Sequence, residues 1–284
     1  MSRERKERRR KILLKREFLR GKRIVEKFLK TQNSYNQYIQ SKITTYGNIP
    51  AITDTYNNIE LNYNELESNI VLFASALQSF GLQKGDFVGI FTENNGLWFP
   101  CDQSVMRCGA VCVLRGSNAP AEELDYIISH SNSSGLILKD STLLNNLKPY
   151  LNNYKFKFII LMFKSENDDT TGLNSPLYYY EDAIQIGKAL EFHPIEQNIE
   201  EPSTILYTSG TTGNPKGVLL THKNLLSQIP SIDVGIMAQK GDKTLQILPI
   251  WHAYEHIAQT YYYTKGCHLH FTTLSGLKNY LLKY

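Results

Sequence analysis

Short, continuously apolar runs alternate with amphipathic stretches between residues 62 and 190. Large apolar residues recur at helical spacing over residues 62–80, and the pattern stops at Gly81, a residue suited to a helix C-terminus. We expect strands over residues 87–91, 110–114, 135–138 and 156–162. Further helices are expected over residues 97–107, from an opening at 117–120, and over residues 181–190. Residues 165–176 are polar and are expected to form a loop. Strands that are apolar at every position are buried on both faces. The alternation therefore predicts an α/β fold with mostly parallel sheets covered by helices.

The length and apolar content suit a folded protein. The chain has 284 residues, 42% of them apolar, which is enough for one large domain or two modest ones. An aromatic fraction of 11% excludes global disorder. No apolar run reaches the roughly 18–20 residues that cross a bilayer, so we do not expect an integral membrane protein.

Cysteine is sparse, with four residues and no Cys-x-x-Cys pair. Four cysteines in a chain of this length do not form a disulfide scaffold, and Cys108 and Cys112 stand among apolar residues. We expect buried free thiols and an intracellular, reducing location.

The charge is strongly asymmetric. Residues 1–30 carry 14 Lys or Arg against 4 Glu, whereas residues 31–284 carry 17 basic against 23 acidic residues. Within residues 1–30, which we call the head, the apolar residues fall at helical intervals: Leu14, Phe18, Val25, Phe28 and Leu29. The pattern predicts a basic amphipathic extension over 1–30, which is suited to an anionic membrane surface. A solvated charged extension and a helix packed on the body remain open.

Other functions of the head are less well supported. The acidic body, and the lack of aromatic residues among the first arginines, disfavour nucleic-acid binding. No apolar core of a secretory signal follows the charges, and four Glu with a single Ser depart from organelle transit peptides. Plastid and cytoplasmic locations both stay open.

The most informative motif is rich in glycine and hydroxyl residues. An apolar run leads into residues 208–213, which are only Gly, Ser or Thr, and Pro215-Lys216-Gly217 then leads to another apolar run. Glycines allow successive backbone N–H groups to converge on an anion, hydroxyls add donors, and lysine adds a charge. This predicts a triphosphate-binding loop. It lacks the glycine and the Ser/Thr that flank the lysine of a Walker loop, and it lacks the dinucleotide fingerprint.

Residues 207–218, Tyr-Thr-Ser-Gly-Thr-Thr-Gly-Asn-Pro-Lys-Gly-Val, resemble the signature loop of the adenylate-forming enzymes. Residues 248–256, Leu-Pro-Ile-Trp-His-Ala-Tyr-Glu-His, resemble the family's next motif, which lines its acyl pocket. Together with residues 115–124, they are most similar to long-chain acyl-CoA and acyl-carrier-protein synthetases of the plant and cyanobacterial type. The resemblance runs from about Asn48 to the last residue, which suggests a partial adenylation domain over 31–284.

The resemblance implies a two-step reaction on a fatty acid. ATP, with Mg²⁺, would convert the carboxylate to an acyl-adenylate, and CoA or acyl-carrier protein would accept the acyl group. By position, Thr208 would help hold magnesium and Lys216 would bind the phosphates. His252 would lie at the acyl-pocket wall with Trp251 beside it. The remaining loop residues would surround the triphosphate: Ser209, Gly210, Thr211, Thr212 and Gly213.

The same resemblance implies that part of the site lies elsewhere. No downstream segment supplies the family's magnesium-binding glutamate, its ribose-binding aspartate or the lysine of its C-terminal lid domain. We expect the chain to be incomplete as an enzyme by itself. The alternative is a non-catalytic module that binds acyl chains or nucleotide, or that interacts with another protein.

A rival motif overlaps the acyl-pocket segment. His252-Ala-Tyr-Glu-His256 fits the His-x-x-Glu-His pattern of inverted zinc metallopeptidases, whose two histidines bind zinc from one helix face. That family needs a further glutamate downstream, and the sequence has no Asp or Glu after Glu255. Zinc peptidase activity is therefore a remote alternative. His268 and His270, at strand spacing, are expected to serve packing.

Overall fold

The computed structural model describes residues 19–165, 171–210, 213–272 and 276. Within these residues, two sheets and their covering helices enclose two clusters of buried apolar side chains. The larger sheet has the order β7-β6-β5-β3-β4-β8-β9. Its strands are β3 (Phe87–Phe91), β4 (Val111–Arg115), β5 (Gly135–Leu138), β6 (Phe158–Leu161), β7 (Leu177–Tyr179), β8 (Pro202–Gly210) and β9 (Gly213–Thr221). Every neighbouring pair is parallel except β8 and β9.

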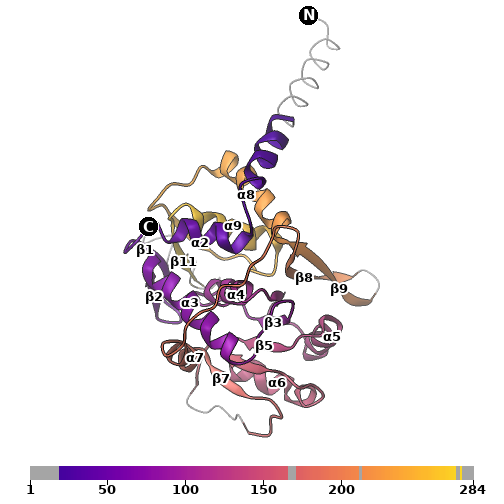
Figure 1. The fold of residues 1–284 in the computed structure, drawn as a ribbon. Helices are drawn as coiled ribbons and strands as arrows, with labels where there is room; N and C mark the ends of the chain where they lie inside the picture. Colours follow the sequence, from indigo (N-terminus) through magenta and orange to yellow (C-terminus); the bar gives the residue numbers. More distant parts are fainter. Residues whose placement is uncertain (1–18, 166–170, 211–212, 273–275, 277–284) are drawn as a thin grey trace, which may run out of the picture.

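Helices cover both faces of this sheet. Figure 1 shows α3, α4 and α7 on one side of the central strands and α5 and α6 on the other. The helices are α2 (Tyr35–Ile43), α3 (Tyr63–Ser79), α4 (Trp98–Arg107), α5 (Ala121–Ser131), α6 (Ser141–Leu151), α7 (Tyr180–Gly187), α8 (His222–Ile236) and α9 (Ala253–Thr264). All residues of β5 and β6 are buried, as expected for strands covered on both faces. The predicted α/β class is confirmed.

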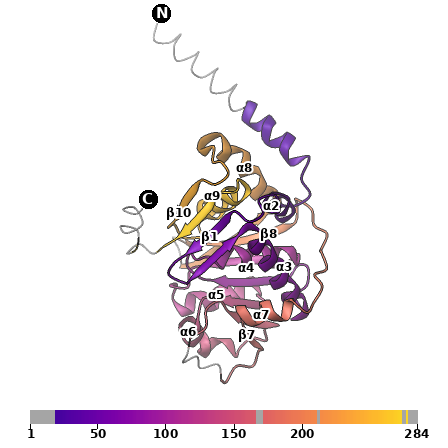
Figure 2. The ribbon, with the colours of Figure 1, turned by 90° about the vertical axis from the view of Figure 1, so that its left-hand side faces the viewer.

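A smaller, mixed sheet was not predicted. It has the order β10-β11-β1-β2, from β1 (Pro50–Asp54), β2 (Ile59–Asn62), β10 (Lys243–Gln246) and β11 (His268–Phe271). Figure 2 shows it towards the α2 and α8 end of the body, with α6 and β7 at the opposite end. Its strands are short and β1 pairs with β11, which lies over 200 residues away, so local sequence patterns could not reveal the pairing.

Most predicted boundaries hold within a few residues. Asn62 caps α3 through a capping box with Glu65, and Gly81 follows the helix at φ 91°. The strand expected over 156–162 is shorter, and the helix expected over 181–190 ends at Gly187. A Cβ atom at Gly187 would lie 2.0 Å from the Leu72 carbonyl oxygen, so this glycine lets α7 pack closely on α3. Part of the expected 165–176 loop, residues 166–170, lies outside the described residues.

Candidate functional site

The glycine- and hydroxyl-rich motif forms an antiparallel hairpin of β8 and β9. Thr208 is directly opposite Lys216 in the register, and Gly210 is opposite Gly213. The two residues predicted to bind magnesium and phosphate are therefore cross-strand neighbours. Strand pairing extends further than predicted: Thr208, Ser209, Gly210 and Gly213 belong to strands, because the ladder persists to the end of the hairpin. Thr211 and Thr212 lie outside the described residues.

Glycines set the shape of the hairpin. Gly213 has φ 128°, a conformation that L side chains rarely adopt. A Cβ atom at Gly217 would lie 3.1 Å from Ile205 Cγ2 and 3.2 Å from Tyr207 Cζ. Lys216 and Thr208 are both exposed, so their polar groups are accessible to an anionic ligand.

Tyr207 anchors the hairpin to α5, a role that sequence reasoning missed. Its side chain is buried, and its hydroxyl oxygen lies 2.7 Å from Nδ1 of His130. Burial raises the pKa of Tyr207, which keeps the phenol neutral at physiological pH. The signal in the sequence was its position at the start of the motif, directly before Thr208.

The second predicted motif lies at the start of α9. His252 is the N-cap residue, and its backbone N–H donates to the Pro249 carbonyl oxygen at 3.1 Å. Its side chain is exposed, and its ring stacks on that of Trp251 with 6.5 Å between centroids. Trp251 in turn contacts Gly116, where a Cβ atom would lie 2.6 Å from Trp251 Cη2. Residues 115–124 and 248–256, which carried the family resemblance, thus meet in space.

Asn94 connects this motif to the larger sheet. Its side chain donates to the carbonyl oxygen of Leu248 and accepts a hydrogen bond from Gln259, which also donates to Glu255. Glu255 is buried, and burial raises its pKa, while the bonds from Gln259 and Asn94 partly offset that rise. Sequence reasoning missed Asn94, although it belongs to a polar run just beyond a buried parallel strand, where binding residues commonly gather.

A mainly apolar cavity of about 670 Å³ lies among β9, α8 and α9. Leu220 of β9 and Ala253 of α9 both line it, so the cavity is bordered by the strand that carries Lys216 and by the residue after His252. Its lining is completed by Asn224, Leu225, Ser227, Gln228, Ser231, Ile232, Tyr254 and Ile257. The space, mostly apolar with a few amide and hydroxyl groups, suits an alkyl chain.

The two histidines of the zinc alternative lie in different surroundings. His252 is exposed, whereas His256 is buried with Nε2 3.4 Å from Oδ1 of Asp102. Across the residues that the structure describes, no three His, Cys, Asp or Glu side chains are grouped so as to hold a metal ion. His268 and His270 lie in β11 with ring centroids 4.0 Å apart, and His268 also contacts the Thr53 hydroxyl.

Thr208, the predicted Mg²⁺ ligand, offers that ion a single side-chain oxygen. Magnesium keeps several waters and is usually bound through one or two protein oxygens plus substrate phosphates. The exposed Thr208 offers one hydroxyl oxygen beside Lys216. One hydroxyl suits a metal that arrives with a nucleotide, and it does not form a resident metal site.

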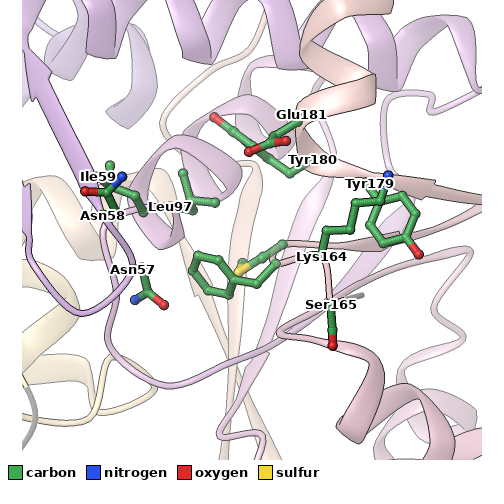
Figure 3. Close-up of a pocket in the computed structure, with 11 residues that line it drawn as sticks. Asn57, Asn58, Ile59, Leu97, Lys164, Ser165, Tyr179, Tyr180 and Glu181 are labelled. Atoms are coloured by element: carbon green, nitrogen blue, oxygen red, sulfur yellow. The ribbon is translucent and has the colours of Figure 1, made fainter. Parts of the chain in front are cut away.

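Another cavity, of about 510 Å³, lies at the opposite edge of the larger sheet from the β8–β9 hairpin. Figure 3 shows Lys164 and Tyr179 on one side of it and Asn57, Asn58 and Ile59 on the other. The Lys164 ammonium lies 4.8 Å from the centroid of the Tyr179 ring. The sheet order separates this cavity from the predicted phosphate loop, so we do not assign it to the nucleotide.

Comparison with known proteins decides the family. The family model described as AMP-binding enzyme matches residues 39–282. The chain belongs to the AMP-binding enzyme family. The predicted adenylate-forming resemblance is thereby confirmed, and the basic residues 1–30 precede the matched region.

Its relatives include fatty-acid ligases. The chain is 34% identical over 260 residues to the chloroplastic long-chain-fatty-acid–[acyl-carrier-protein] ligase AEE15 of Arabidopsis thaliana, covering 86% of this chain and 36% of the relative. It is 31% identical over 191 residues to fatty acyl-CoA synthetase A of Dictyostelium discoideum, covering 64% of this chain and 28% of the relative. The chain therefore spans about a third of the length of these relatives.

Solved structures share the fold. A long-chain-fatty-acid-CoA ligase (FadD1) from Archaeoglobus fulgidus superposes with a TM-score of 0.76 at 23% identity, covering 89% of this chain and 50% of that one. The N-terminal domain of FACL13 from Mycobacterium tuberculosis gives 0.72 at 19% identity, covering 88% and 60%. The fold is therefore the N-terminal portion of the adenylate-forming fold.

Proposed function

We propose that this AMP-binding chain contributes the phosphate loop and the acyl-pocket wall of a fatty-acid ligase. The reaction activates a long-chain fatty acid with ATP to an acyl-adenylate, and CoA or acyl-carrier protein then accepts the acyl group. The observation that carries the proposal is that Thr208 and Lys216 face each other on a hairpin whose strand also lines the apolar cavity.

Each group has a role that follows from its chemistry. The Lys216 ammonium and the hairpin N–H groups of Ser209, Gly210 and Gly213 would stabilise negative charge on the triphosphate, and Thr211 and Thr212 would add donors. Positioned donors of this kind lower the barrier to phosphoryl chemistry without covalent help from the protein. Thr208 would hold Mg²⁺, which when bound neutralises phosphate charge.

The acyl chain would occupy the cavity between α8 and α9. Leu220, Leu225, Ile232 and Ile257 would remove its methylene groups from water, each burial contributing about 0.8 kcal/mol per CH₂. His252, beside Ala253 at the cavity wall, would contact the reacting carboxylate end. Four buried free thiols support an intracellular, reducing location for this reaction.

Ligand titration of the whole chain tests this proposal. We expect Mg·ATP to bind, with affinity reduced at least tenfold by Lys216→Ala and unchanged by Lys188→Ala, a lysine on the exposed end of α7. We expect palmitate binding to survive Lys216→Ala and to weaken at least tenfold in Ile232→Asp. Failure of wild-type chain to bind either ligand would overturn the proposal.

Palmitate-dependent ATP–pyrophosphate exchange separates an enzyme from a binding module. We expect exchange to need the partner segments that the longer relatives contain, with Lys216→Ala abolishing it in the complemented reaction. Exchange by this chain alone would contradict our expectation that its nucleotide site is incomplete. Binding of both ligands, with no exchange even after complementation, would replace the ligase by the non-catalytic module.

A further inference from the structure

The N-terminal extension is attached to the body through its apolar side. Residues 19–29 are helical, and the helix projects from the body beyond α8 (Figures 1 and 2). Near its C-terminal end, Phe28 and Leu29 pack against the core, and the Phe28 ring meets Tyr38 edge-on with 5.1 Å between centroids. Val25, one turn earlier, is half-buried. Phe28 and Leu29 belong to the apolar side that the sequence predicted, and they face the protein core.

A different face of the helix is exposed and positively charged. Arg20, Arg23 and Lys27 lie at spacings of three and four residues, so they form one stripe. Leu19 and Ile24 flank the stripe and are 46% and 45% exposed. Together these five residues line a shallow depression of about 430 Å³, which we call the cationic face.

Nothing in the described part of the chain neutralises the cationic face. None of the ion pairs found among the described residues involves Arg20, Arg23 or Lys27. Residues 19–30 contain five Lys or Arg and a single acid, Glu26, and the sequence of residues 1–18 adds nine basic against three acidic residues. The body of residues 31–284 is net acidic, so the attraction for an anionic surface comes from the N-terminal helix.

The combination of cations and exposed aliphatic side chains favours a lipid bilayer over an acidic protein. Arginine and lysine bind lipid phosphates and carboxylates, while Leu19 and Ile24 can bury their side chains in the boundary between head groups and acyl chains. Electrostatic binding to a bilayer tolerates a long, irregular basic run, whereas a protein partner needs a matching arrangement of acids. Before Phe28 the helix projects away from the body (Figures 1 and 2), and all five residues of the cationic face are exposed.

We propose that the cationic face docks the protein on anionic lipid bilayers. Arg20, Arg23 and Lys27 contact the anionic head groups, and Leu19 and Ile24 insert beside them. Phe28 and Leu29 hold the helix to the body, so docking fixes the orientation of the whole chain and does not merely tether it. This binding does not depend on ligase activity.

Co-sedimentation of the full chain with vesicles tests the proposal. We expect binding to phosphatidylcholine vesicles that contain phosphatidylserine, weak binding to phosphatidylcholine alone, and a steep loss of binding as salt rises. A basic residue near an anionic bilayer contributes about fivefold to partitioning, so R20E/R23E/K27E should weaken binding at least about 100-fold. The matched control K155E/K188E/K240E changes the net charge equally at exposed positions on the body, and should change binding by less than about threefold.

The aliphatic residues give an independent test. L19S/I24S keeps every charge, and we expect it to weaken vesicle binding by at least about fivefold because two inserted side chains are lost. Circular dichroism checks that each variant is folded. Equal loss in the body control and the helix variant would overturn the proposal. The proposal would also be overturned if the wild-type chain did not bind the vesicles but was retained on immobilised polyglutamate through Arg20, Arg23 and Lys27. The cationic face would then bind an acidic protein.

Discussion

The side-chain amide nitrogen of Asn94 donates a hydrogen bond to the backbone carbonyl oxygen of Leu248, with 3.0 Å between the two atoms. Asn94 follows β3 at the centre of the larger sheet, and Leu248 opens the motif that leads into α9. One side chain thus ties residues 248–256 to the larger sheet. Gln259 extends the contact to α9, since its amide lies 2.8 Å from Asn94 Oδ1 and 2.9 Å from Glu255 Oε1.

Removing the Asn94 amide should weaken the proposed acyl site more than it destabilises the fold. In Asn94→Ala the carbonyl of Leu248 and the amide of Gln259 lose partners, at a cost of about 1–3 kcal/mol in the free energy of unfolding. We expect palmitate affinity to fall about tenfold, measured by calorimetry beside urea unfolding. Asn145→Ala, on the exposed face of α6, is the control. Unchanged palmitate affinity in a variant of lowered stability would show that Asn94 serves the fold alone.

The ion pair of Glu67 and Arg107 ties α3 to α4. Both guanidinium nitrogens Nη1 and Nη2 of Arg107 lie 2.7 Å from carboxylate oxygens of Glu67, and Arg107 is 4% exposed. Gln40 of α2 donates to the same carboxylate at 3.1 Å. Arg107→Met leaves a largely buried carboxylate without its partner, and we expect a loss of about 3 kcal/mol in unfolding free energy.

A double-mutant cycle isolates the Glu67–Arg107 pair itself. Glu67→Met/Arg107→Met should be less destabilised than the sum of the two single variants, because it removes both charges together. Urea unfolding of the four proteins measures the difference. Additive single effects would show that the two charges do not stabilise each other. Arg107→Lys should recover only part of the lost unfolding free energy, since lysine cannot make the bidentate contact with the Glu67 carboxylate.

The larger sheet could be predicted because its information is local. The apolar runs of β3, β5 and β6 and the Asn62 cap of α3 lie within short windows of sequence. The glycine- and hydroxyl-rich motif was equally visible in the sequence, and its role in binding phosphate stays a prediction. The predicted length of the loop was wrong. Its glycine-rich residues suggested a loop over 208–213, but the pairing of β8 with β9 extends to Gly210 and Gly213.

Contacts between distant segments could not be predicted. The pairing of β1 with β11, the meeting of Gly116 with Trp251, and the Asn94–Leu248 bond all join residues more than 100 positions apart. The head illustrates the same limit. Helical periodicity placed Val25, Phe28 and Leu29 on one apolar face, but periodicity does not say whether lipid or the protein's own core covers that face.

His222 should make the stability of the fold depend on pH. It is fully buried at the start of α8, and its Nδ1 accepts a hydrogen bond from the backbone N–H of Tyr35 at 3.3 Å. Burial lowers its pKa to about 4, with Lys84 adding to the effect and Glu201 and Asp102 opposing it. An unfolded histidine titrates near about 6.5, so between these values the unfolded chain binds more protons.

The contribution of His222 is therefore complete above about pH 6.5 and is lost as the pH falls towards about 4, by up to about 3 kcal/mol. Urea unfolding at about pH 7 and about pH 4.5 measures this loss. His222→Gln keeps an acceptor for Tyr35 and should flatten the difference between the two pH values. Burial also lowers the pKa of His270 to about 4, so some dependence of the unfolding free energy on pH should remain in this variant. Equal slopes in wild type and His222→Gln would contradict the assignment.

Gly116 should control the position of Trp251, because a Cβ atom there would lie 2.6 Å from Cη2 and 2.7 Å from Cζ2 of the indole. Contacts under 3.0 Å force one partner to move, and the half-buried Trp251 is the freer one, since the loop of Gly116 is tied to β4. In Gly116→Ala we expect a red-shifted tryptophan emission and a severalfold loss of palmitate affinity, as displacement of Trp251 carries its neighbour His252 with it. The chain has two tryptophans, and Trp98 is fully buried. In a Trp251→Phe background the remaining emission should not respond to Gly116→Ala; a shift that persists there would place the disturbance at Trp98 in the core instead.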